Sequence, residues 1–248
     1  MNVLGVIPAR FKSSRFPGKP LALIHGKTMI QRVYEQAFKA SSLSHIIVAT
    51  DDELILNHVL GFGGHVVMTS ESHNSGTERC LEVVNHLSDT SDFDVIVNIQ
   101  GDEPLIDPEQ IDKVSSVFLN PDTQIATLAK IIQNKDDIES PNIVKLVIDK
   151  NNRALYFSRY PVPYIRNIKD TYHNYYKHIG IYGFRKHILK EICLLKPSKL
   201  EIAESLEQLR WLENAYRISV SFTDTESLSV DIPEDIFKVE TYLKKQNL

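Results

Sequence analysis

The sequence is poor in cysteine and has no long apolar run. Its two cysteines, Cys80 and Cys193, lie in helix-like patterns, and no Cys/His spacing typical of a metal site occurs. Because no signal peptide is visible, we expect both to be reduced core thiols in a cytoplasmic protein. No run of roughly 18 or more apolar residues is present, so we expect no membrane span and no membrane partner.

An excess of positive charge is also absent. The 248 residues include 28 Lys and Arg against 32 Asp and Glu, which gives a net charge of -4. Nucleic-acid-binding domains are usually basic, so this balance predicts no nucleic-acid partner. The hydrophobic share of 42% and the charged share of 24% are those of an ordinary globular protein with a sizeable core.

Within this acidic chain, one loop near the N-terminus is strongly basic. The apolar run 3–7 predicts a short buried strand that ends at Pro8. The loop after it holds four cations, Arg10, Lys12, Arg15 and Lys19. Like charges repel, and Gly18 lets backbone N–H groups approach an oxyanion, so the loop predicts a polyphosphate site bracketed by Arg10 and Lys19. The alternative is a solvated basic surface loop.

Two familiar nucleotide-binding loops are missing. A Walker A loop has a glycine five positions before a Gly-Lys-Ser or Gly-Lys-Thr run. Here Pro20 follows Gly18 and Lys19, and residue 13 is a serine. The glycine-rich segment 61–64 leads into a strand rather than a helix, so it is not a dinucleotide-binding fingerprint.

Strand-loop-helix units repeat through the first part of the chain. Strands are predicted at 45–50, 65–69 and 94–100, with helices at 28–40, at 53–60, up to residue 87 and from Pro108. Segment 94–100 is the most apolar of these strands, as expected in the middle of a parallel sheet. We therefore predict an α/β fold with a doubly wound, mostly parallel sheet.

After about residue 122 the pattern changes. Strands are predicted at 124–132, 143–149, 154–159, 177–184 and 217–223, and helices at 186–195, at 200–216 and from Pro233. We predict a single domain over residues 1–248, with a core of about 1–122 and 200–248. A smaller lobe with a mixed sheet is inserted at about 123–199. The polar loop 161–174 is expected to close over a ligand.

Polar side chains follow the ends of predicted strands, where an open α/β sheet places its ligands. Gln100 and Asp102 follow the most apolar strand, and Asp231 lies at a strand-to-helix turn far along the chain. Carboxylate oxygens suit Mg²⁺, which takes one or two carboxylates with phosphate oxygens and water. The alternatives are a plain Gly-Asp turn for Asp102 and a helix N-cap for Asp231.

One strand of the smaller lobe carries a second polar group. His178, Gly180 and Tyr182 alternate along it and therefore share a face. Gly180 is expected to leave a gap between the two polar rings, which would suit a small ligand. The alternative is a histidine and a tyrosine that are satisfied within the core.

Other polar residues fit a binding site less specifically. Ser75 and Gly76 open a helix whose N-terminus offers N–H donors and a hydroxyl. Glu207 and Gln208 lie beside apolar neighbours on a helix, where they either complete a buried network or bind a polyol. Arg159 ends its strand, where it either holds a carboxylate through two hydrogen bonds or forms an ordinary surface ion pair.

Taken together, these motifs resemble the sugar-nucleotide nucleotidyltransferases, and most closely their subgroup that makes CMP-activated 3-deoxy-manno-octulosonate (Kdo). The resemblance covers nearly the whole chain through segments 8–21, 75–79, 97–104, 154–159, 178–183, 206–210 and 230–235, in the order of that family. Departures are small: Phe11 and Phe16 replace the usual Tyr and Leu, Asn74 lies at a variable position, and Ser229 replaces a common glycine.

The resemblance implies a reaction and its participants. CTP and Kdo would be coupled to CMP-Kdo and pyrophosphate for lipopolysaccharide biosynthesis, with Mg²⁺ as cofactor. The family also implies a homodimer formed through the smaller lobe. Two other readings stay open: a cytidylyltransferase for another acidic sugar, such as 8-amino-Kdo or a sialic-acid-like substrate, and a regulator that binds nucleotide sugars without turnover. The presence of Asp102 and Lys19 counts against the regulator.

The resemblance also implies roles for individual residues. Phosphate binding would fall to Arg10 and Lys19, and Mg²⁺ would be held by Asp102 and Asp231. The nucleotide side would contain Ser75, Gly76 and Arg79, with Pro8 and Ala9 framing the cytosine. The sugar acid would be faced by Gln100, Arg159, His178, Tyr182, Glu207 and Gln208.

Overall fold

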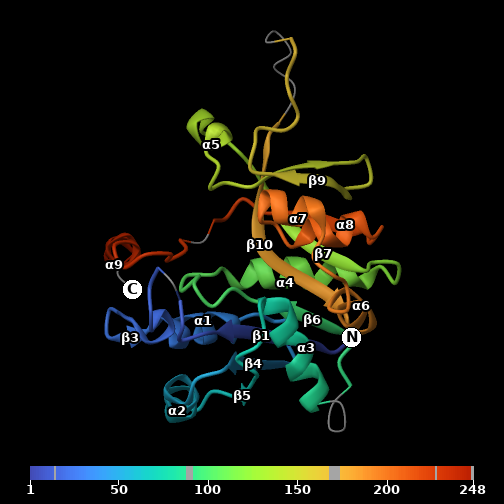
Figure 1. Ribbon diagram of the computed structural model, residues 1–248. Helices are drawn as coiled ribbons and strands as arrows, with labels where there is room; N and C mark the ends of the chain where they lie inside the picture. Colours follow the sequence, from blue (N-terminus) through green and yellow to red (C-terminus); the bar gives the residue numbers. More distant parts are fainter. Residues whose placement is uncertain (14, 88–91, 168–173, 227, 247–248) are drawn as a thin grey trace. The chain divides into compact units, whose positions relative to one another are not determined.

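A computed structural model describes residues 1–13, 15–87, 92–167, 174–226 and 228–246, and it falls into two compact units (Figure 1). The first unit contains Met1–Asp112 and Glu226–Leu248, and the second contains Lys113–Thr225. The bounds differ from the predicted ones, because segments 113–122 and 200–225 had been assigned to the core and lie in the second unit. The predicted closing loop 161–174 falls partly on residues 168–173, which lie outside the described residues, as does Ser14.

The first unit is built on four parallel strands, which confirms the predicted α/β arrangement. Their order is β6 (Val95–Asn98), β1 (Val3–Ala9), β4 (His45–Thr50) and β5 (Val66–Met68). Every residue of β6 is buried, and so is nearly all of β1. Strands buried in this way read as continuous apolar runs, which is why the sequence identified them.

Helices pack on this sheet. They are α1 (Met29–Ala37) on β1 and β4, α2 (Glu53–Gly61) on β4 and β5, and α3 (Gly76–Leu87) on β1, β4 and β6. In α1, Thr28 caps the N-terminus by accepting a hydrogen bond from the Gln31 N–H, as predicted. The buried stripe of α1 includes Met29, Ile30 and Val33, and burying one such side chain is worth about 1.5–3 kcal/mol.

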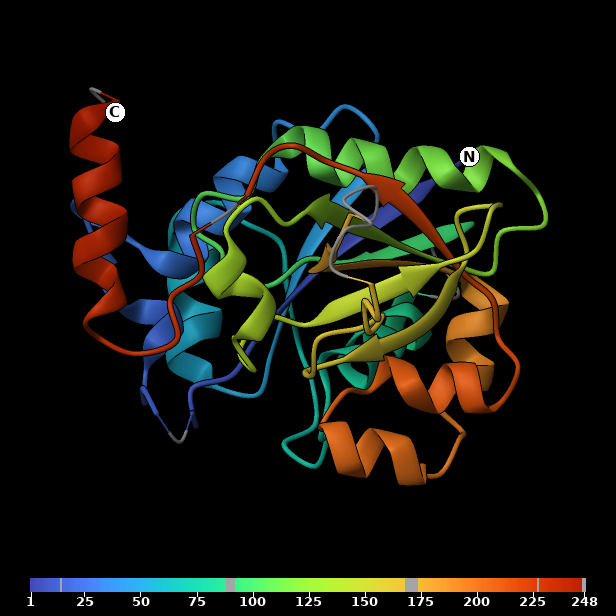
Figure 2. The same cartoon turned by 90° about the horizontal axis from the view of Figure 1, so that it is seen from above.

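The remaining elements of the first unit are short, apart from two helices. A 3-10 helix η1 (Lys19–Leu21) leads into the small antiparallel pair β2 (Leu23–Ile24) and β3 (Lys27–Thr28). Helix α4 (Pro108–Ser116) begins at the predicted proline and runs into the second unit, and α9 (Asp235–Lys245), red in Figure 2, packs against β2.

Strand β1 continues through Pro8, so the prediction that Pro8 ends it is wrong. Pro8 pairs in register with Ala49 of the parallel strand β4. Its carbonyl faces Gly101, where a Cβ atom would come within 2.5 Å of the Pro8 oxygen. The N and O atoms of one strand residue point to the same side, so the missing N–H lies on the side away from β4. Strand pairing with β4 therefore loses nothing.

The second unit has the predicted mixed sheet. Its strands are β7 (Ile125–Ile131), β8 (Lys145–Ile148), β9 (Ala154–Ser158), β10 (Tyr176–Arg185) and β11 (Ile218–Phe222). Strand β7 pairs with β11 in parallel and with β10 antiparallel, and β8 pairs antiparallel with both β10 and β9. The unit also contains the 3-10 helix η2 (Val117–Leu119) and the helices α5 (Lys135–Glu139) and α6 (Lys186–Ile192). Two more helices follow α6.

The long helix predicted over 200–216 is two short helices instead. Helix α7 (Lys199–Glu204) begins with a complete capping box between Ser198 and Glu201, and α8 (Gln208–Glu213) follows. Between them Ser205 adopts a left-handed conformation with φ 52°. Left-handed residues at helix ends are most often glycine, so a serine there gave the sequence no sign of the break.

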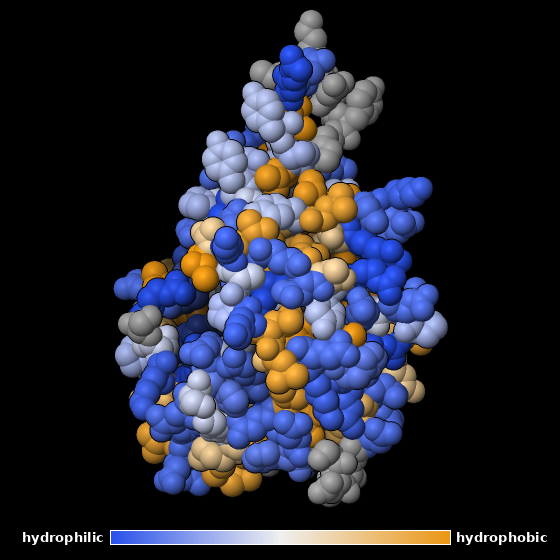
Figure 3. Space-filling model, turned by 45° about the vertical axis from the view of Figure 1, so that its right-hand side comes forward, coloured by the Kyte–Doolittle hydropathy of each residue, from blue (hydrophilic) through white to orange (hydrophobic). Residues whose placement is uncertain are grey.

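The surface is that of a charged globular protein. On the face in Figure 3 hydrophilic side chains dominate, and apolar ones form separate small groups. Within the described part of the chain, every helix is too short or too polar to traverse a lipid bilayer.

Candidate functional site

Lys19 of the basic loop and Asp102, which follows β6, meet in the first unit. The Lys19 ammonium donates hydrogen bonds to Asp102 Oδ2 at 2.8 Å and to the Val230 carbonyl at 2.9 Å. The two side chains are only 15% and 29% exposed, so solvent screens their attraction less than at an open surface. The site thus joins the basic loop, the end of β6 and the C-terminal segment.

An apolar cluster holds the C-terminal segment in this position. Buried side chains from three stretches of chain form it: Ile24, Met29, Val230, Val239 and Leu243. Phe16 of the basic loop and Leu105, just after Asp102, pack against it. In addition, the Val230 N–H donates to the Asp102 carbonyl at 2.9 Å. Asp231 therefore follows a residue whose backbone is fixed to Asp102.

Asp231 is not a helix N-cap, so that alternative is wrong. Helix α9 begins at Asp235, two residues later than predicted, and Glu234 is its N-cap residue. The carboxylate of Asp235 accepts hydrogen bonds from the N–H groups of Asp231 at 3.0 Å and Ile232 at 3.2 Å. The Lys238 ammonium and these N–H donors hold the pKa of Asp235 below its usual value. Asp235 thus fixes the turn, and the Asp231 carboxylate is not used in capping.

The two predicted metal ligands form a donor set that fits Mg²⁺. Asp102 bonds to Lys19, and Asp231 Oδ1 lies 3.3 Å from Arg15 Nη2, so each carboxylate has a cationic neighbour. Among the described residues, no group of three or more His, Cys, Asp or Glu side chains converges as a metal site. One or two carboxylates are the protein ligands that Mg²⁺ uses when phosphates and water complete its coordination, so these two side chains beside the basic loop fit that ion.

The basic loop is folded on itself rather than extended. Gly18 has φ 70°, and its N–H donates to the Phe11 carbonyl at 2.9 Å. This left-handed conformation favours glycine, which explains the residue type. Lys12 forms an exposed ion pair with Glu71 at 2.7 Å. Arg10 is exposed, and across the described ranges no carboxylate pairs with it.

Pro8 lies between two glycines that permit close approach. Gly76 is the first residue of α3, and a Cβ atom there would lie 3.3 Å from Pro8 Cγ and 3.2 Å from Asn98 Nδ2. On the other side, Gly101 approaches the Pro8 carbonyl too closely for any side chain. Ser75 accepts a hydrogen bond from the Glu78 N–H at 3.3 Å, which caps α3.

Pro8 and Gly76, two of the residues predicted for the nucleotide side, therefore lie next to each other. Ala9, also predicted there, is buried at the end of β1, and Gln100, predicted for the sugar acid, is half-buried just after β6. Sequence reasoning gave no role to Gly101 or Asn98. The signal available for Gly101 was its position between Gln100 and Asp102, two residues that had been selected.

Arg79 differs from these residues because it is buried, with 1% exposure. Its Nη1 donates to Thr69 Oγ1 at 2.8 Å, and its Nη2 binds Asp51 Oδ2 at 2.5 Å. These partners follow β5 and β4, so Arg79 anchors α3 to the ends of two strands. A side chain so enclosed offers a ligand little surface, and its contribution to a nucleotide site would be to position α3.

In the second unit, His178 and Tyr182 share a face as predicted, but no gap separates them. Strand β10 has a bulge between Ile179 and Tyr182, which pair with the consecutive residues Leu128 and Thr127 of β7. Two extra residues in β10 bring the rings together, with centroids 5.2 Å apart. The expected gap at Gly180 is therefore absent, because a regular strand was assumed.

Burial favours the neutral form of both rings. Burial lowers the pKa of His178 to about 3. Burial also raises the pKa of Tyr182 well above its usual value, and the Glu207 carboxylate adds to the effect. Tyr182 Oη is buried without a hydrogen-bond partner among the residues that the structure describes. Neutral, desolvated groups of this kind suit hydroxyls rather than charges.

Arg159 binds backbone carbonyls rather than a surface carboxylate. Its Nε donates to the Glu204 carbonyl at 2.8 Å, Nη1 to the Pro141 carbonyl at 3.0 Å and Nη2 to the Ser205 carbonyl at 3.5 Å. A cation on the last carbonyls of a helix is a favourable C-terminal cap. Arg159 thereby holds the break between α7 and α8, just before Glu207 and the buried Gln208.

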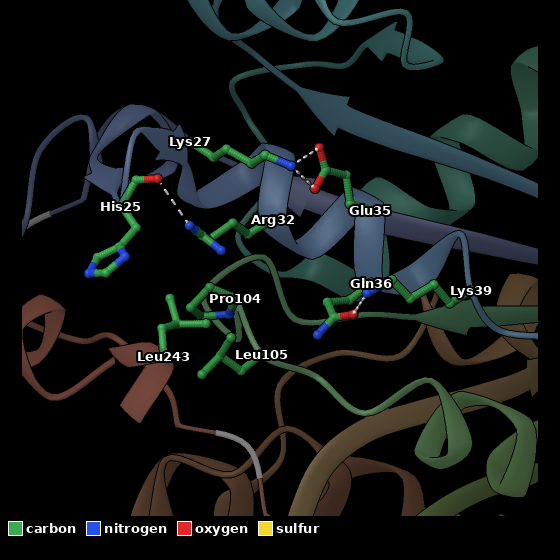
Figure 4. A pocket seen from close by; sticks show the side chains of 9 residues that line it. All are labelled: His25, Lys27, Arg32, Glu35, Gln36, Lys39, Pro104, Leu105 and Leu243. Atoms are coloured by element: carbon green, nitrogen blue, oxygen red, sulfur yellow. Dashed lines mark hydrogen bonds and ion pairs between the residues drawn. The ribbon is translucent and has the colours of Figure 1, made fainter. Parts of the chain in front are cut away.

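A separate cavity of about 480 Å³ lies in the first unit (Figure 4). It is lined by α1, the β2–β3 turn, Pro104, Leu105 and Leu243. Its charged side chains are paired within the protein: Lys27 with Glu35 at 2.7 Å, Lys39 with Gln36 at 2.7 Å, and Arg32 with two backbone carbonyls. The cavity contains none of the predicted site residues, and we assign no ligand to it.

Comparisons with known proteins agree along nearly the whole chain. The family described as cytidylyltransferase matches residues 4–220. The 3-deoxy-manno-octulosonate cytidylyltransferase of Parabacteroides distasonis is 53% identical, with 98% of each chain covered. The enzyme of the same name from Bacteroides thetaiotaomicron is 52% identical, with 100% of each chain covered.

Solved structures give the same result. A CMP:2-keto-3-deoxy-manno-octonic acid synthetase in complex with CTP is 39% identical, covers 100% of both chains and superposes with a TM-score of 0.92. A cytidylyltransferase from Leptospira borgpetersenii is 17% identical, with 99% of this chain and 87% of that chain covered and a TM-score of 0.65. At that identity, the second match supports the fold alone.

Proposed function

The chain belongs to the cytidylyltransferase family, and on this premise we propose that it couples CTP and Kdo to give CMP-Kdo and pyrophosphate. The observation that carries the proposal is the junction of Lys19, Asp102 and Val230 in the first unit. It places a cation and a carboxylate together, with a second carboxylate in the next residue, Asp231. Phosphoryl-transfer sites need such charges to neutralise a triphosphate.

The nucleotide is assigned to the first unit. The phosphates are bound by Arg10 and Lys19. Arg10 is exposed and has no ion pair among the described residues. Ser75 and Gly76 add a hydroxyl and backbone N–H donors at the start of α3, which has twelve residues. Pro8 and Ala9 frame the cytosine, as the resemblance implies, and glycine at 76 and 101 keeps side chains away from Pro8.

The cofactor is assigned as Mg²⁺, held by Asp102 and Asp231. Once bound, it would neutralise the triphosphate and lower the pKa of the attacking hydroxyl. Each carboxylate has a cation beside it, Lys19 at Asp102 and Arg15 at Asp231. The protein's own contribution is to position substrates and balance charge.

The sugar acid is assigned to the second unit. Gln100, which the resemblance also gives to the sugar acid, lies in the first unit. His178 and Tyr182 offer neutral polar groups, and Glu207 and Gln208 lie at the start of α8. The reaction forms a bond between the anomeric C2 oxygen of Kdo and the α-phosphorus of CTP. The bond from that phosphorus to the bridging oxygen of pyrophosphate breaks in line with it.

The proposal is tested by pyrophosphate release from CTP and Kdo, with and without Mg²⁺. We expect release that requires both substrates and the metal. A panel containing 8-amino-Kdo and a sialic acid decides among acidic sugars, and a higher kcat/KM for one of these would replace Kdo as the substrate. Absence of release with every sugar acid would overturn the proposal.

Nucleotide choice gives a separate prediction. ATP and GTP should support turnover far more slowly than CTP, because a slot framed by Pro8 and Ala9 is too small for a purine. Steady-state kcat/KM for the three nucleotides at saturating Kdo measures this preference. Equal turnover with ATP and CTP would show that these residues do not set the choice.

A further prediction concerns the sugar side. His178→Ala should raise the KM for Kdo by about tenfold or more, the effect of losing a buried hydrogen bond in a desolvated site. The affinity for CTP, measured by calorimetry, should stay close to that of the wild type. An equal fall in CTP affinity would indicate that His178 is structural.

The location and assembly of the enzyme are also proposed. We infer a cytoplasmic enzyme that supplies lipopolysaccharide biosynthesis, since CTP is a cytoplasmic nucleotide. A homodimer formed through the smaller lobe is expected from the resemblance to the family, and light scattering of the purified protein would test it.

A further inference from the structure

The bulge of β10 is held by one buried hydroxyl. Thr127 lies in β7 opposite Tyr182 and has no exposed surface. Its Oγ1 donates to the carbonyl of Ile181 at 2.8 Å and lies 3.2 Å from the carbonyl of Ile179. The third neighbour of Oγ1 is the imidazole Nε2 of His178, at 3.0 Å. One side chain therefore contacts both ends of the bulge and the histidine beside it.

These three contacts determine which nitrogen of His178 carries the proton. A threonine hydroxyl has one hydrogen to donate and two lone pairs to accept with. The carbonyls can only accept, so the hydroxyl hydrogen is directed to them. His178 Nε2 must then be the donor to Oγ1. In a neutral imidazole only one nitrogen bears hydrogen, so Nδ1 is left as a bare acceptor.

Two polar atoms thus remain available on adjacent rings. Among the described residues, His178 Nδ1 makes no hydrogen bond, and Tyr182 Oη makes none of normal geometry, although the Thr127 side chain lies close enough to lower the pKa of Tyr182. Phe157 packs edge-on against the imidazole, with centroids 5.1 Å apart, and Trp211 packs in the same way on Tyr182. Aromatic packing keeps the two rings from turning, so their free atoms are fixed as one acceptor and one hydroxyl.

We propose that Thr127 is a positioning residue that fixes His178 as its Nε2–H tautomer, so that Nδ1 accepts a hydrogen bond from a hydroxyl of the sugar acid. Tyr182 Oη donates to a neighbouring oxygen of the same sugar. This inference rests on the proposed function and assigns hydrogen-bonding roles within it. His178 is the acceptor and Tyr182 the donor through which the pair recognises a polyol. A carboxylate, which only accepts, cannot occupy the position facing Nδ1.

The decisive variant is Thr127→Val, which keeps the shape of the side chain and removes the hydroxyl. We expect the KM for Kdo to rise about tenfold, as for a lost hydrogen bond in a desolvated site, with the KM for CTP unchanged. Thr127→Ser retains the hydroxyl and should restore most of the affinity for Kdo. Thr123→Val is the matched control, because the buried Thr123 donates to the Val117 carbonyl at 2.9 Å in the same unit.

The tautomer is read independently of activity. In the full-length protein labelled with ¹⁵N-histidine, the His178 signals are those missing from His178→Gln. A wild-type spectrum near neutral pH should show a protonated Nε2 and a bare Nδ1, and Thr127→Val should shift the balance towards Nδ1–H. Thr123→Val should lower the melting temperature without changing either the tautomer or the KM for Kdo.

The outcomes distinguish failure of the Thr127 proposal from failure of the proposed function. A wild-type His178 with its proton on Nδ1 would overturn the proposal, and this reading stands even if Thr127→Val fails to fold. An unchanged KM for Kdo in a folded Thr127→Val protein would also overturn it. An Nε2–H tautomer in a wild-type protein that releases no pyrophosphate from CTP and Kdo would instead overturn the proposed function.

Discussion

Asp102→Asn should lower kcat by about 10²-fold or more without a comparable loss of stability, since transition-state charge stabilisation by a metal is worth several kcal/mol. Asparagine keeps the size of the side chain and an oxygen that can accept from Lys19, but it removes the negative charge. Pyrophosphate release across a Mg²⁺ titration, with a thermal melt of each protein, measures both effects.

Asp231→Asn should behave in the same way, and the double variant should be little worse than the worse single one. Groups that act as a unit are not additive, so near-equal losses would indicate a shared role. Asp52→Asn is the matched control. Asp52 caps α2 through hydrogen bonds from the Leu54 and Ile55 N–H groups, and asparagine caps nearly as well as aspartate.

The contrary outcome is specific. A folded Asp231→Asn enzyme with near-native kcat and an unchanged Mg²⁺ requirement would show that the second carboxylate ligand lies elsewhere. Because Asp231 does not cap α9, such a result could not be explained by a helix cap that tolerates asparagine.

Lys19→Ala should lower kcat/KM. The expected loss of transition-state stabilisation is about 2–5 kcal/mol, the range for removing one partner of a buried charge pair. The ammonium has two contacts, with Asp102 and with the Val230 carbonyl, so its removal also loosens the C-terminal segment beside Asp231. Steady-state kinetics with CTP varied at saturating Kdo measures the first effect, and a thermal melt measures the second.

Lys27→Ala controls for the loss of a cation. Lys27 is paired with Glu35 in the same unit but lies outside the basic loop. It should leave kcat/KM close to that of the wild type, because exposed ion pairs contribute little. If Lys19→Ala were no worse than Lys27→Ala, the assignment of Lys19 to the phosphates would be wrong.

The parts of the fold that the sequence predicts are those where one local pattern suffices. The parallel strands of the first unit are continuous apolar runs, and α1 shows both a cap at Thr28 and a buried stripe. The break after α7 could not be predicted in this way. It depends on Arg159, which binds the Glu204 and Ser205 carbonyls from 45 or more residues away, and a serine carries no turn signal of its own.

In the candidate site too, local patterns identify some residues, whereas others depend on long-range contacts. Asp102 and Lys19 were identifiable because polar residues at strand ends and cations around a glycine are local features, and the structure brings these two together. The closeness of Asp231 to them depends on an apolar cluster drawn from the N-terminal loop and α9, which no local pattern shows. Gly101 was missed because its role depends on its distance from Pro8, a residue of another strand.

The two extra residues in β10 also constrain how this strand can change in length during evolution. Side chains alternate between faces, so an insertion or deletion of one residue at the bulge would turn Tyr182 and Phe184 to the opposite face. Phe184 is fully buried, and that inversion would place a polar neighbour in the core. Loss of two residues would restore an unbroken ladder and keep every side chain on its present face. Relatives in which this strand differs in length should therefore differ by pairs of residues.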